Sequence, residues 1–413
     1  MTNVQKNSFV RKRKLPFKTV LALILEKTVK SLQIKLNEFM EKLSMETVTD
    51  SAFCQARQKL RHTAFIEMNQ KTIVDVMYSE EEEHLRYKGM RLLAIDGSRI
   101  RLPESKSIRE EYGTTRYRNQ DGAEGEHPTA TISVCYDVLN NIAIDSVLGK
   151  KLCYEGDLAE HHLPYLQKGD LVVCDRNYQS YIFMAHLVKR GVNFLIRGGG
   201  NKYACVKQMF NSKEKSKLIS LEACKQVKSQ VVKLGLPTQI NIRLIRVTLD
   251  TGETEILITT LLDNRKFPYR IFKDLYFQRW KIETFYDILK NRLELTHFSG
   301  ITAESVRQDF YATVFISGLE SILTEDVDQI LIEKSLSNKH LRKTNKNISF
   351  NAIKNRVFEI LNHNYDTDLL MEKLTTLFLT APTPIRDLRE VTRRKPRARS
   401  RIHYYRCKRK HSY

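Results

Sequence analysis

The sequence lacks the features that define membrane-spanning, secreted and disulfide-linked proteins. Its longest apolar runs, such as Val20–Leu25, are far shorter than the roughly 20 residues that cross a bilayer, so we expect no membrane partner. The basic segment before that run has neither the apolar length nor the small-residue cleavage site of a signal peptide. The seven cysteines are odd in number and form no Cys-x-x-Cys pair, which argues against a disulfide framework or zinc site and favours reduced, mostly packed thiols in the cytoplasm.

Heptads, short-period repeats and long low-complexity linkers are also missing, and 413 residues with 41% hydrophobic content suggest about two to four globular domains. The net charge of +21 is concentrated at the chain ends. Residues 1–18 carry six basic residues and no acid, and residues 386–413 carry twelve basic residues and two acids, so residues 19–385 retain only +5. Basic arms on a nearly balanced body indicate a polyanionic partner, with nucleic acid as the first candidate.

Apolar residues at helical spacing predict helices across residues 17–79. Asp50 and Ser51 are suited to cap a helix over Ala52–Leu60. That helix is amphipathic and basic. It is either a solvated face or a DNA-contacting face, and in the second case the contacts come from Arg57, Lys59 and Arg61.

From residue 91 the pattern changes to strands. Apolar or β-rich runs are predicted as strands over Leu92–Ile95, Thr129–Val138, Ile142–Leu148, Leu171–Cys174 and Asn193–Arg197. Asn140 and Asn141 separate two of these runs and tolerate the positive φ of a hairpin turn. Helical stretches lie between the later runs, so we expect an α/β fold with a mixed sheet flanked by helices.

The remaining chain is predicted to hold a hinge, an insertion and further helices. Gly198, Gly199 and Gly200 lack the Lys-Ser/Thr of a phosphate loop, so they are interpreted as a domain hinge. Residues 201–262 are typical of a separate β-rich insertion. Long helices are expected over 269–295, 302–334 and 350–380.

The helix through 276–290 carries a polar stripe. At about 100° per residue, one stripe roughly 60° wide contains Tyr276, Arg279, Glu283 and Lys290. This stripe borders the apolar face, so its side chains are able to point into a cleft. The alternative is an exposed salt-bridge ladder, because Arg279 and Glu283 are four residues apart.

Two aspartates follow predicted strands. Asp96 ends the first strand and Asp175 follows another directly, although either could be only a turn former or helix cap. Together with Glu283 they could form a cluster of three carboxylates, which repel one another without a counter-charge. Mg²⁺ or Mn²⁺ resolves such repulsion, and two ions about 4 Å apart suit phosphodiester chemistry. Arg279 and Lys290 would then hold the phosphates of the DNA strand being cut.

These residues carry a resemblance to a known family. The spacing Tyr-x2-Arg-x3-Glu-x6-Lys at Tyr276, Arg279, Glu283 and Lys290 resembles the signature of the DDE transposases of bacterial insertion sequences, specifically insertion-sequence family four. Two further blocks are similar to those around the family's two aspartates: Ala94-Ile95-Asp96-Gly97-Ser98 and Val173-Cys174-Asp175-Arg176-Asn177-Tyr178. The resemblance covers about residues 50–300.

The resemblance implies a ribonuclease-H-like core with a β-rich insertion and all-α terminal regions. The expected domains are a helical DNA-binding domain at 1–88, a catalytic core at 89–198 and 263–300, an insertion at 199–262, a C-terminal helical region at 301–380, and a basic tail at 381–413.

It also implies a mechanism. Asp96, Asp175 and Glu283 would be the catalytic carboxylates and bind two Mg²⁺ or Mn²⁺ ions, and DNA contacts would come from Tyr276, Arg279, Lys290 and Arg176. Members cleave double-stranded DNA at terminal inverted repeats, seal each end as a hairpin, reopen it, and join the 3′-hydroxyl to target DNA. They act as homodimers on paired ends. For this chain that places the activity in the bacterial cytoplasm, at the nucleoid.

The sequence departs from the family pattern at two points. Asn177 stands where the family has glycine, which is tolerable because asparagine also adopts positive φ. Relatives use an insertion tryptophan to stack a flipped base during hairpin formation, whereas the one tryptophan here is Trp280; Tyr203 or Phe210 could substitute.

Two other functions remain open at this stage: a structure-specific nuclease on the same fold, and a DNA-binding protein that has lost catalysis. The basic tail is expected to be a non-specific DNA tether, because arginine-rich segments contact phosphates without reading bases.

Overall fold

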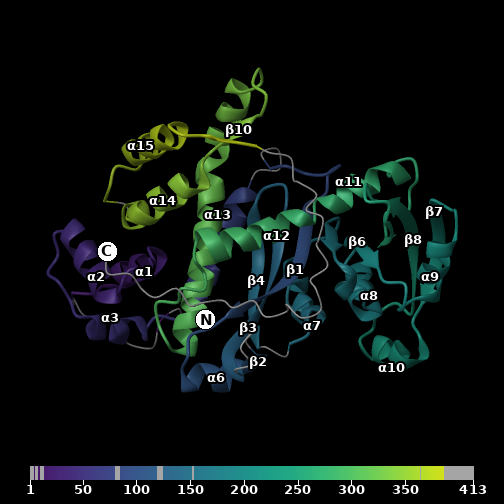
Figure 1. The fold of residues 1–413 in the computed structure, drawn as a ribbon, viewed down its shortest axis with the longest axis horizontal. Coiled ribbons are helices and arrows are strands. Elements are labelled where there is room, and N and C mark those ends of the chain that lie inside the picture. Colours follow the sequence, from purple (N-terminus) through teal and green to yellow (C-terminus); the bar gives the residue numbers. More distant parts are fainter. Residues whose placement is uncertain are drawn as a thin grey trace. The chain divides into compact units, whose positions relative to one another are not determined.

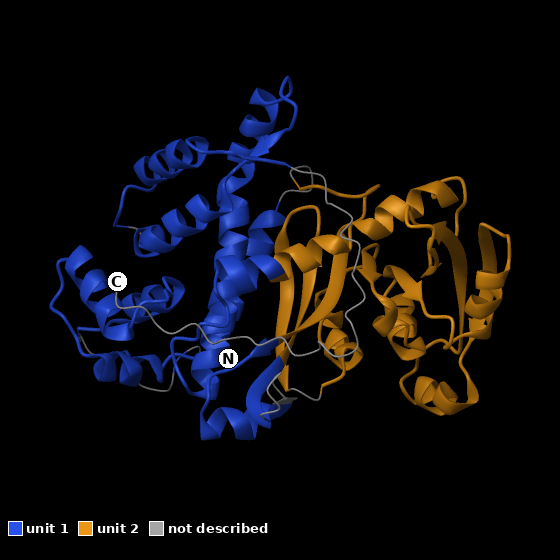
Figure 2. Ribbon diagram, viewed as in Figure 1, with its two compact units in different colours: residues 1–79, 100–130, 287–413 blue, residues 80–99, 131–286 orange. Residues whose placement is uncertain are grey.

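The structure is a computed structural model that describes residues 4, 8–9, 14–79, 84–118, 124–150, 153–362 and 364–385. The chain forms two compact units, shown in different colours in Figure 2. Unit 1 comprises residues 1–79, 100–130 and 287–413, and unit 2 comprises residues 80–99 and 131–286. The predicted tether at 386–413 and most of the basic N-terminal arm lie outside the described residues.

Unit 2 is built on a mixed sheet (Figure 1). In spatial order its described strands are β4 (Ile142–Lys150), β3 (Glu124–Asp137), β1 (Leu92–Arg101), β5 (Leu171–Cys174), β6 (Asn193–Gly198), β9 (Thr254–Thr259), β8 (Gln239–Thr248) and β7 (Ser216–Glu222). β1 and β3 continue into residues of unit 1, where β2 (Thr114–Arg118) also pairs with β3.

Helices connect the strands of unit 2. They are α7 (Glu155–Glu160), η2 (Leu163–Tyr165), η3 (Arg176–Tyr178), α8 (Tyr181–Lys189), α9 (Ala204–Asn211), α10 (Lys225–Lys233), η4 (Tyr269–Ile271), α11 (Phe272–Phe277) and α12 (Trp280–Asp287). All four residues of β5 are buried, as expected for an apolar strand covered on both faces.

The central strand order confirms the expected fold class. β5 runs parallel to both β1 and β6, so β1, β5 and β6 all point the same way. β3 runs antiparallel to β1, since Val138 N donates to Leu92 O and Leu102 N donates to Pro128 O. The order β4-β3-β1-β5-β6 with these directions is the ribonuclease-H-like arrangement.

The hairpin predicted between β3 and β4 is confirmed. Asn141 has a φ of +58°, which asparagine adopts at little cost. The Asn140 side chain donates to an Asp137 carboxylate oxygen at 2.8 Å and to Leu85 O at 3.1 Å. The first asparagine therefore fixes the turn through its side chain, and the second fixes it through its backbone conformation.

Two strand predictions need correction. The first strand does not end at Asp96 but continues to Arg101, because it pairs with β3 beyond the point where its pairing with β5 stops. Residues 201–262 are not a separate β domain either. β9 pairs antiparallel with β6, in register from Leu195↔Thr259 to Gly198↔Ile256, so the insertion extends the same sheet and adds two helices.

The single helix predicted over 269–295 is interrupted. α11 ends at Phe277, Gln278 and Arg279 form a turn, and α12 begins at Trp280. A π-helical segment, η5 (Ile288–Arg292), follows. The wheel angles assumed one uninterrupted helix, so the common stripe of four signature residues is not realised as predicted.

Unit 1 is mostly helical. Its described helices are α1 (Phe17–Leu25), α2 (Leu32–Lys42), α3 (Asp50–Arg57), α4 (Thr63–Met68), η1 (Asn69–Val74), α5 (Asp75–Met77), α6 (Lys106–Tyr112), η5, α13 (Ala303–Lys334), α14 (Lys346–Ile360) and α15 (Thr367–Leu379). The long α13 contacts α1, α4, α14 and α15 (Figure 1). Thr302 and Ser305 form a reciprocal cap at its start. The C-terminal region is not purely helical, since β10 (Arg342–Lys343) pairs with β11 (Thr383–Pro384).

No described helix has both the length and the apolar character needed to cross a membrane. The six described cysteines are free thiols, but Cys54 and Cys224 are exposed, so the expectation of mostly packed thiols holds only for the buried Cys135 and Cys174 and in part for the others.

Arg57 is buried, which contradicts its predicted contact with DNA. Arg57 is 4% exposed. Its guanidinium donates to Gln308 Oε1 at 2.6 Å and to Asp309 Oδ1 at 2.8 Å. Burial raises the pKa of Asp309, but the charges of Arg57 and Lys27 outweigh this effect and hold the pKa below its ordinary value.

The cap of α3 also differs from the prediction. Asp50 and Ser51 were expected to cap this helix, but the Thr49 side chain accepts from Ala52 N.

Removal of this buried cation should destabilise unit 1. We expect Arg57→Ala to lower the free energy of unfolding by about 3 kcal/mol, because the carboxylate of Asp309 remains buried without its main counter-charge. Chemical denaturation checks this. The matched control, Arg61→Ala, removes an exposed arginine and should change stability by less than about 0.5 kcal/mol. Equal effects of the two variants would contradict the structural role of Arg57.

Candidate active site

Asp96 and Asp175 lie at neighbouring positions on the sheet. β1 and β5 are parallel, and the last residues in register are Ile95 and Cys174. The next residue along the chain after each of these is one of the two aspartates, so Asp96 and Asp175 follow directly where the pairing of β1 with β5 ends, although β1 itself continues to Arg101. Asp175 Oδ1 accepts a hydrogen bond from Asn177 N at 2.7 Å, and this bond caps the short helix η3.

Asp96 is in an unfavourable place for a charge. Its side chain is 16% exposed. The pKa of Asp96 is raised to about 7, mainly by burial; the Arg279 charge lowers this pKa, and the charges of Asp175 and Glu155 raise it. The ionised carboxylate is therefore costly near neutral pH in the absence of an added cation.

Arg279 is the main counter-charge of this site. One guanidinium nitrogen lies 3.1 Å from Glu283 Oε1 and the other lies 4.0 Å from Asp96 Oδ2. The guanidinium also lies 4.8 Å from the Trp280 ring centroid and 5.7 Å from that of Tyr276. The break in the signature helix thus places one cation between two of the three predicted carboxylates.

Tyr276 and Arg279 are largely buried, at 7% and 6% exposure. Burial raises the pKa of Tyr276 well above its ordinary value, so its phenol stays neutral. Neither side chain offers a solvent-facing surface to DNA in this structure. Their expected contacts with the DNA backbone would therefore require a rearrangement around the turn at 278–279.

The other predicted DNA contacts are placed differently. Arg176 is exposed in η3, one residue after Asp175. In unit 1, Lys59 is partly exposed and Arg61 is exposed, both beyond the end of α3. Lys290 lies in the π-helical segment η5, which belongs to unit 1, whereas the acids belong to unit 2.

A fourth acid, Glu155, was missed by sequence reasoning. It is the first residue of α7, and its side chain packs against Gly97. If position 97 carried a Cβ, that atom would lie only 2.7 Å from Glu155 Cγ. Its Oε2 accepts from Asn177 Nδ2 at 3.1 Å. No spacing motif marks Glu155 in the sequence; its only signal is the glycine directly after Asp96, which leaves room for a neighbouring side chain.

Two buried tyrosines belong to elements that also carry or follow the acids, Tyr178 in η3 after Asp175 and Tyr286 in α12 with Glu283. Tyr286 donates its hydroxyl to the backbone oxygen of Asp96 at 2.6 Å. Tyr178 is 0% exposed, and its hydroxyl has no hydrogen-bond partner among the described residues. A buried, unpaired hydroxyl costs about 1–3 kcal/mol, which makes Tyr178 a candidate for contact with a bound polar group.

Comparison with known proteins identifies this arrangement. The family model described as transposase DDE domain matches residues 87–319, which is more than half of the chain and includes Asp96, Asp175 and Glu283. The chain belongs to this transposase family. It is a DDE-type DNA transposase, an enzyme that cleaves and joins DNA.

Two further comparisons add little to this assignment. No curated protein sequence matches the transposase. A solved structure, the cryo-EM structure of the piggyBac transposase synaptic complex with hairpin DNA, is similar with a TM-score of 0.44 and 9% sequence identity. The similarity covers 95% of this chain and 81% of that chain.

The acids of the transposase fit a hard divalent cation by their chemistry. Asp96 and Asp175 offer carboxylate oxygens at one sheet edge, and Glu155 is close enough for its charge to raise the pKa of Asp96. Within the described residues, however, no three His, Cys, Asp or Glu side chains are already arranged to hold an ion. Glu283 is instead paired with Arg279. The carboxylates that could bind a cation are present, but in this structure they are not arranged around one position.

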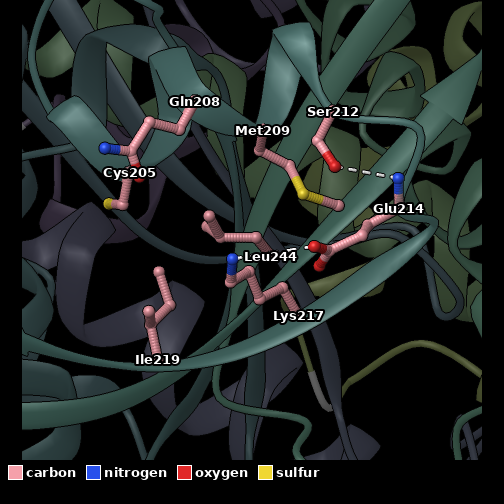
Figure 3. Close-up of a pocket in the computed structure, with 8 residues that line it drawn as sticks. All are labelled: Cys205, Gln208, Met209, Ser212, Glu214, Lys217, Ile219 and Leu244. Carbon is pink, nitrogen blue, oxygen red and sulfur yellow. Dashed lines mark hydrogen bonds and ion pairs between the residues drawn. The ribbon is translucent and has the colours of Figure 1, made fainter.

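A pocket of about 180 Å³ lies elsewhere in unit 2, between α9 and the strands β7 and β8 (Figure 3). Apolar side chains of Met209, Ile219 and Leu244 line it, and Lys217 Nζ lies 3.7 Å from Glu214 Oε1 at its edge. None of the predicted site residues of the transposase lines this pocket.

Proposed function

We propose that this transposase belongs to insertion-sequence family four and performs cut-and-paste transposition. It would cleave DNA at terminal inverted repeats and transfer the ends into target DNA. The observation that carries the proposal is the placement of Asp96 and Asp175 directly after the paired segments of the parallel strands β1 and β5, with Glu283 linked to Asp96 through Arg279. The Tyr-Arg-Glu-Lys spacing supports the narrower family assignment.

In this proposal Asp96, Asp175 and Glu283 hold two Mg²⁺ or Mn²⁺ ions. Such ions activate a water or a 3′-hydroxyl and stabilise the leaving oxygen. The chain itself supplies the burial that makes an uncompensated Asp96 charge costly, which favours uptake of a cation. Arg279 pairs with Glu283 and offsets part of the Asp96 charge in the free chain, and its guanidinium would be able to pair with a phosphate once Glu283 leaves it.

The proposed DNA contacts come from both units. Arg176 is exposed beside the acids, and unit 1 offers Lys59, Arg61 and Lys290, while Tyr276 and Arg279 would contact the DNA backbone after rearrangement. A homodimer would hold two transposon ends in a bacterial cell, at the nucleoid.

Tyr203 and Phe210 are the candidates to stack a flipped base in the hairpin step. The Tyr203 hydroxyl donates to Gln179 O at 2.9 Å, and Phe210 lies beside Gly200. Neither lines the pocket of Figure 3.

Product analysis tests the proposed function against its alternatives. The full chain is incubated with Mg²⁺, a plasmid that carries the gene with its flanking genomic DNA, and a second target plasmid. Joined molecules in which a 3′-end of the flanking DNA is linked to the target support the transposase. Cut ends without joined product would favour a structure-specific nuclease, and binding without cleavage would favour an inactive DNA-binding protein.

The basic tail offers a separate prediction. Deletion of residues 386–413 removes twelve basic and two acidic residues. If about half of the basic residues contact phosphates, the slope of log affinity against log salt should become shallower by about 5. Affinity falls at low salt, whereas preference for transposon ends is retained because phosphate contacts carry no sequence information. Filter binding at several salt concentrations measures both, and loss of end preference in the truncated chain would contradict the tether role.

A further inference from the structure

Arg243 is a buried cation in the insertion, and among the described residues its hydrogen-bond partners are all neutral. It lies in β8 and is 1% exposed. Its guanidinium donates to Ser216 Oγ, Asn264 Oδ1 and Phe267 O, each at 2.7 Å. Leu261 O accepts a longer bond, at 3.5 Å. A buried charge is costly unless hydrogen bonds satisfy it, so these oxygens hold the guanidinium in one place.

Three of the four acceptors, all except Ser216, belong to the segment that leads into the signature helix, α11 and α12. This segment, residues 260–268, connects β9 to η4. It forms a turn in which Asp263 Oδ1 accepts from two backbone nitrogens, at 2.7 and 3.1 Å. Burial lowers the pKa of Arg243, and the charge of Asp263 opposes this effect. The guanidinium therefore fixes a turn that lies just before the signature helix.

Arg243 also contacts the signature helix itself. Its guanidinium carbon lies 5.4 Å from the ring centroid of Phe272, the first residue of α11, which is 0% exposed. Tyr276 follows four residues later and so lies on the same side of α11. The Tyr276 ring in turn lies 5.7 Å from the guanidinium of Arg279. A continuous series of contacts thus runs from β8 to the turn that carries Arg279.

Two contacts at the surface join the insertion to the same part of the chain. Lys215, directly before β7, donates to the Tyr269 hydroxyl in η4 at 3.2 Å. Lys273 in α11 forms an ion pair with Asp250, which lies in the turn between β8 and β9. Exposed pairs contribute little to stability, so the buried Arg243 is the main connection between the insertion and the signature helix.

We propose that Arg243 is a positioning residue for DNA cleavage: it fixes residues 260–268 and the start of α11, and thereby sets the positions of Arg279 and Glu283. This inference rests on the proposed function, because the roles of Arg279 and Glu283 in cleavage belong to it. The burial of Arg243 leaves it no surface for DNA, so its effect on cleavage passes through the signature helix.

The test compares the same substitution at two arginines of β8. Arg243→Lys keeps the charge but loses the planar fork that reaches several acceptors. Arg246→Lys is the matched control. Arg246 lies on the opposite face of β8 and donates to Met209 O and Phe210 O at the end of α9, at 3.3 and 2.9 Å. Both arginines bind backbone oxygens, but only Arg243 contacts the signature helix.

Two readouts separate positioning from stability. Trp280 is the one tryptophan of the chain and lies 4.8 Å from the Arg279 guanidinium, so its fluorescence reports on the turn in the free chain. Arg243→Lys should shift its emission to longer wavelength. Single-turnover cleavage of the plasmid with the flanking DNA, at saturating enzyme and in Mg²⁺, should slow by about tenfold, while the Kd for that DNA stays within about twofold. Arg246→Lys should leave the emission and the cleavage rate unchanged.

A second variant tests the same contact with less risk to folding. Asn264→Ala removes one acceptor of the guanidinium at an exposed position. It should shift the Trp280 emission in the same direction and slow cleavage by about threefold. Unchanged emission in both Arg243→Lys and Asn264→Ala would overturn the inference. Equal effects of Arg243→Lys and Arg246→Lys would also overturn it, because they would show a general loss of stability.

Glu283→Gln separates this inference from the function beneath it. The variant should lose cleavage if Glu283 belongs to the active site. Loss with Glu283→Gln, together with normal cleavage and normal Trp280 emission in Arg243→Lys, would overturn the role of Arg243 alone. Normal cleavage by Glu283→Gln would overturn the proposed site and the inference together.

Discussion

Asp96→Asn should lose DNA cleavage by about 10³-fold or more and, at the same time, stabilise the free protein. The activity falls because the asparagine amide is a poor ligand for a hard cation, and bound ions contribute several kcal/mol to stabilising the transition state. The stability rises because the replaced carboxylate is 16% exposed and lies beside two other acids. Plasmid cleavage and thermal unfolding in EDTA measure the two effects.

The stabilisation expected for Asp96→Asn should depend on pH. Asp96 titrates near 7 in the folded chain and near 3.8 when unfolded, so the folded state binds its proton more tightly. Its contribution to stability is present below about pH 4 and is lost as the pH rises to about 7, by about 2–4 kcal/mol. Asp96→Asn should therefore exceed the unmodified chain in stability at pH 8 in EDTA. A less stable variant would show that the charge is compensated.

Arg279→Gln should destabilise the free protein, whereas Asp96→Asn stabilises it. Both variants should lose DNA cleavage. The variant leaves Asp96 and Glu283 without their shared cation, which is expected to lower the free energy of unfolding by about 3 kcal/mol. Cleavage should fall by about 10²–10³-fold, because a positioned cation near the reacting phosphate is lost. Denaturation and single-turnover cleavage measure these changes.

A double variant distinguishes the two roles of Arg279. Adding Glu283→Gln to Arg279→Gln removes one of the unpaired acids, so stability should recover in part while cleavage stays lost. Arg176→Gln, which removes an exposed arginine of the same unit, should change stability by less than about 0.5 kcal/mol. Additive stability losses in the double variant would contradict the pairing of Arg279 with Glu283.

The positions of Asp96 and Asp175 could be predicted because they depend on short-range patterns. Leu171–Cys174 is an apolar run without polar interruption, and the run at Leu92–Ile95 is similar, so both were recognised as buried strands. In neighbouring parallel strands, the residues that directly follow the paired segments lie close together, and these residues are Asp96 and Asp175. The same patterns could not show where β1 ends, because its last residues pair with β3 rather than β5.

The geometry around Glu283 could not be predicted from periodicity. Neither glycine nor proline marks the turn at Gln278–Arg279, and the local sequence is compatible with an unbroken helix. At this turn Arg279 is buried, with its guanidinium near the rings of Tyr276 and Trp280. Packing interactions of this kind arise only in the folded chain, so a helical wheel does not contain them.

Long-range partners explain the two largest errors. Arg57 was expected at the surface because it lies on a basic helix, but its partner Asp309 is 252 residues away in the sequence. Glu155 was overlooked because it belongs to a short helix without a motif, and its neighbours Gly97 and Asn177 come from other segments. In both residues the role is set by a contact across the fold, whereas the sequence pattern reports only near neighbours.

In the proposed mechanism, acids from distant parts of the chain hold divalent cations against DNA. The most direct measurement is anomalous scattering from crystals of the full chain soaked in Mn²⁺. We predict a peak within about 2.5 Å of carboxylate oxygens of both Asp96 and Asp175, with Glu283 released from Arg279 when DNA is bound. No peak at this sheet edge, with Glu283 still paired to Arg279 in the DNA complex, would contradict the account.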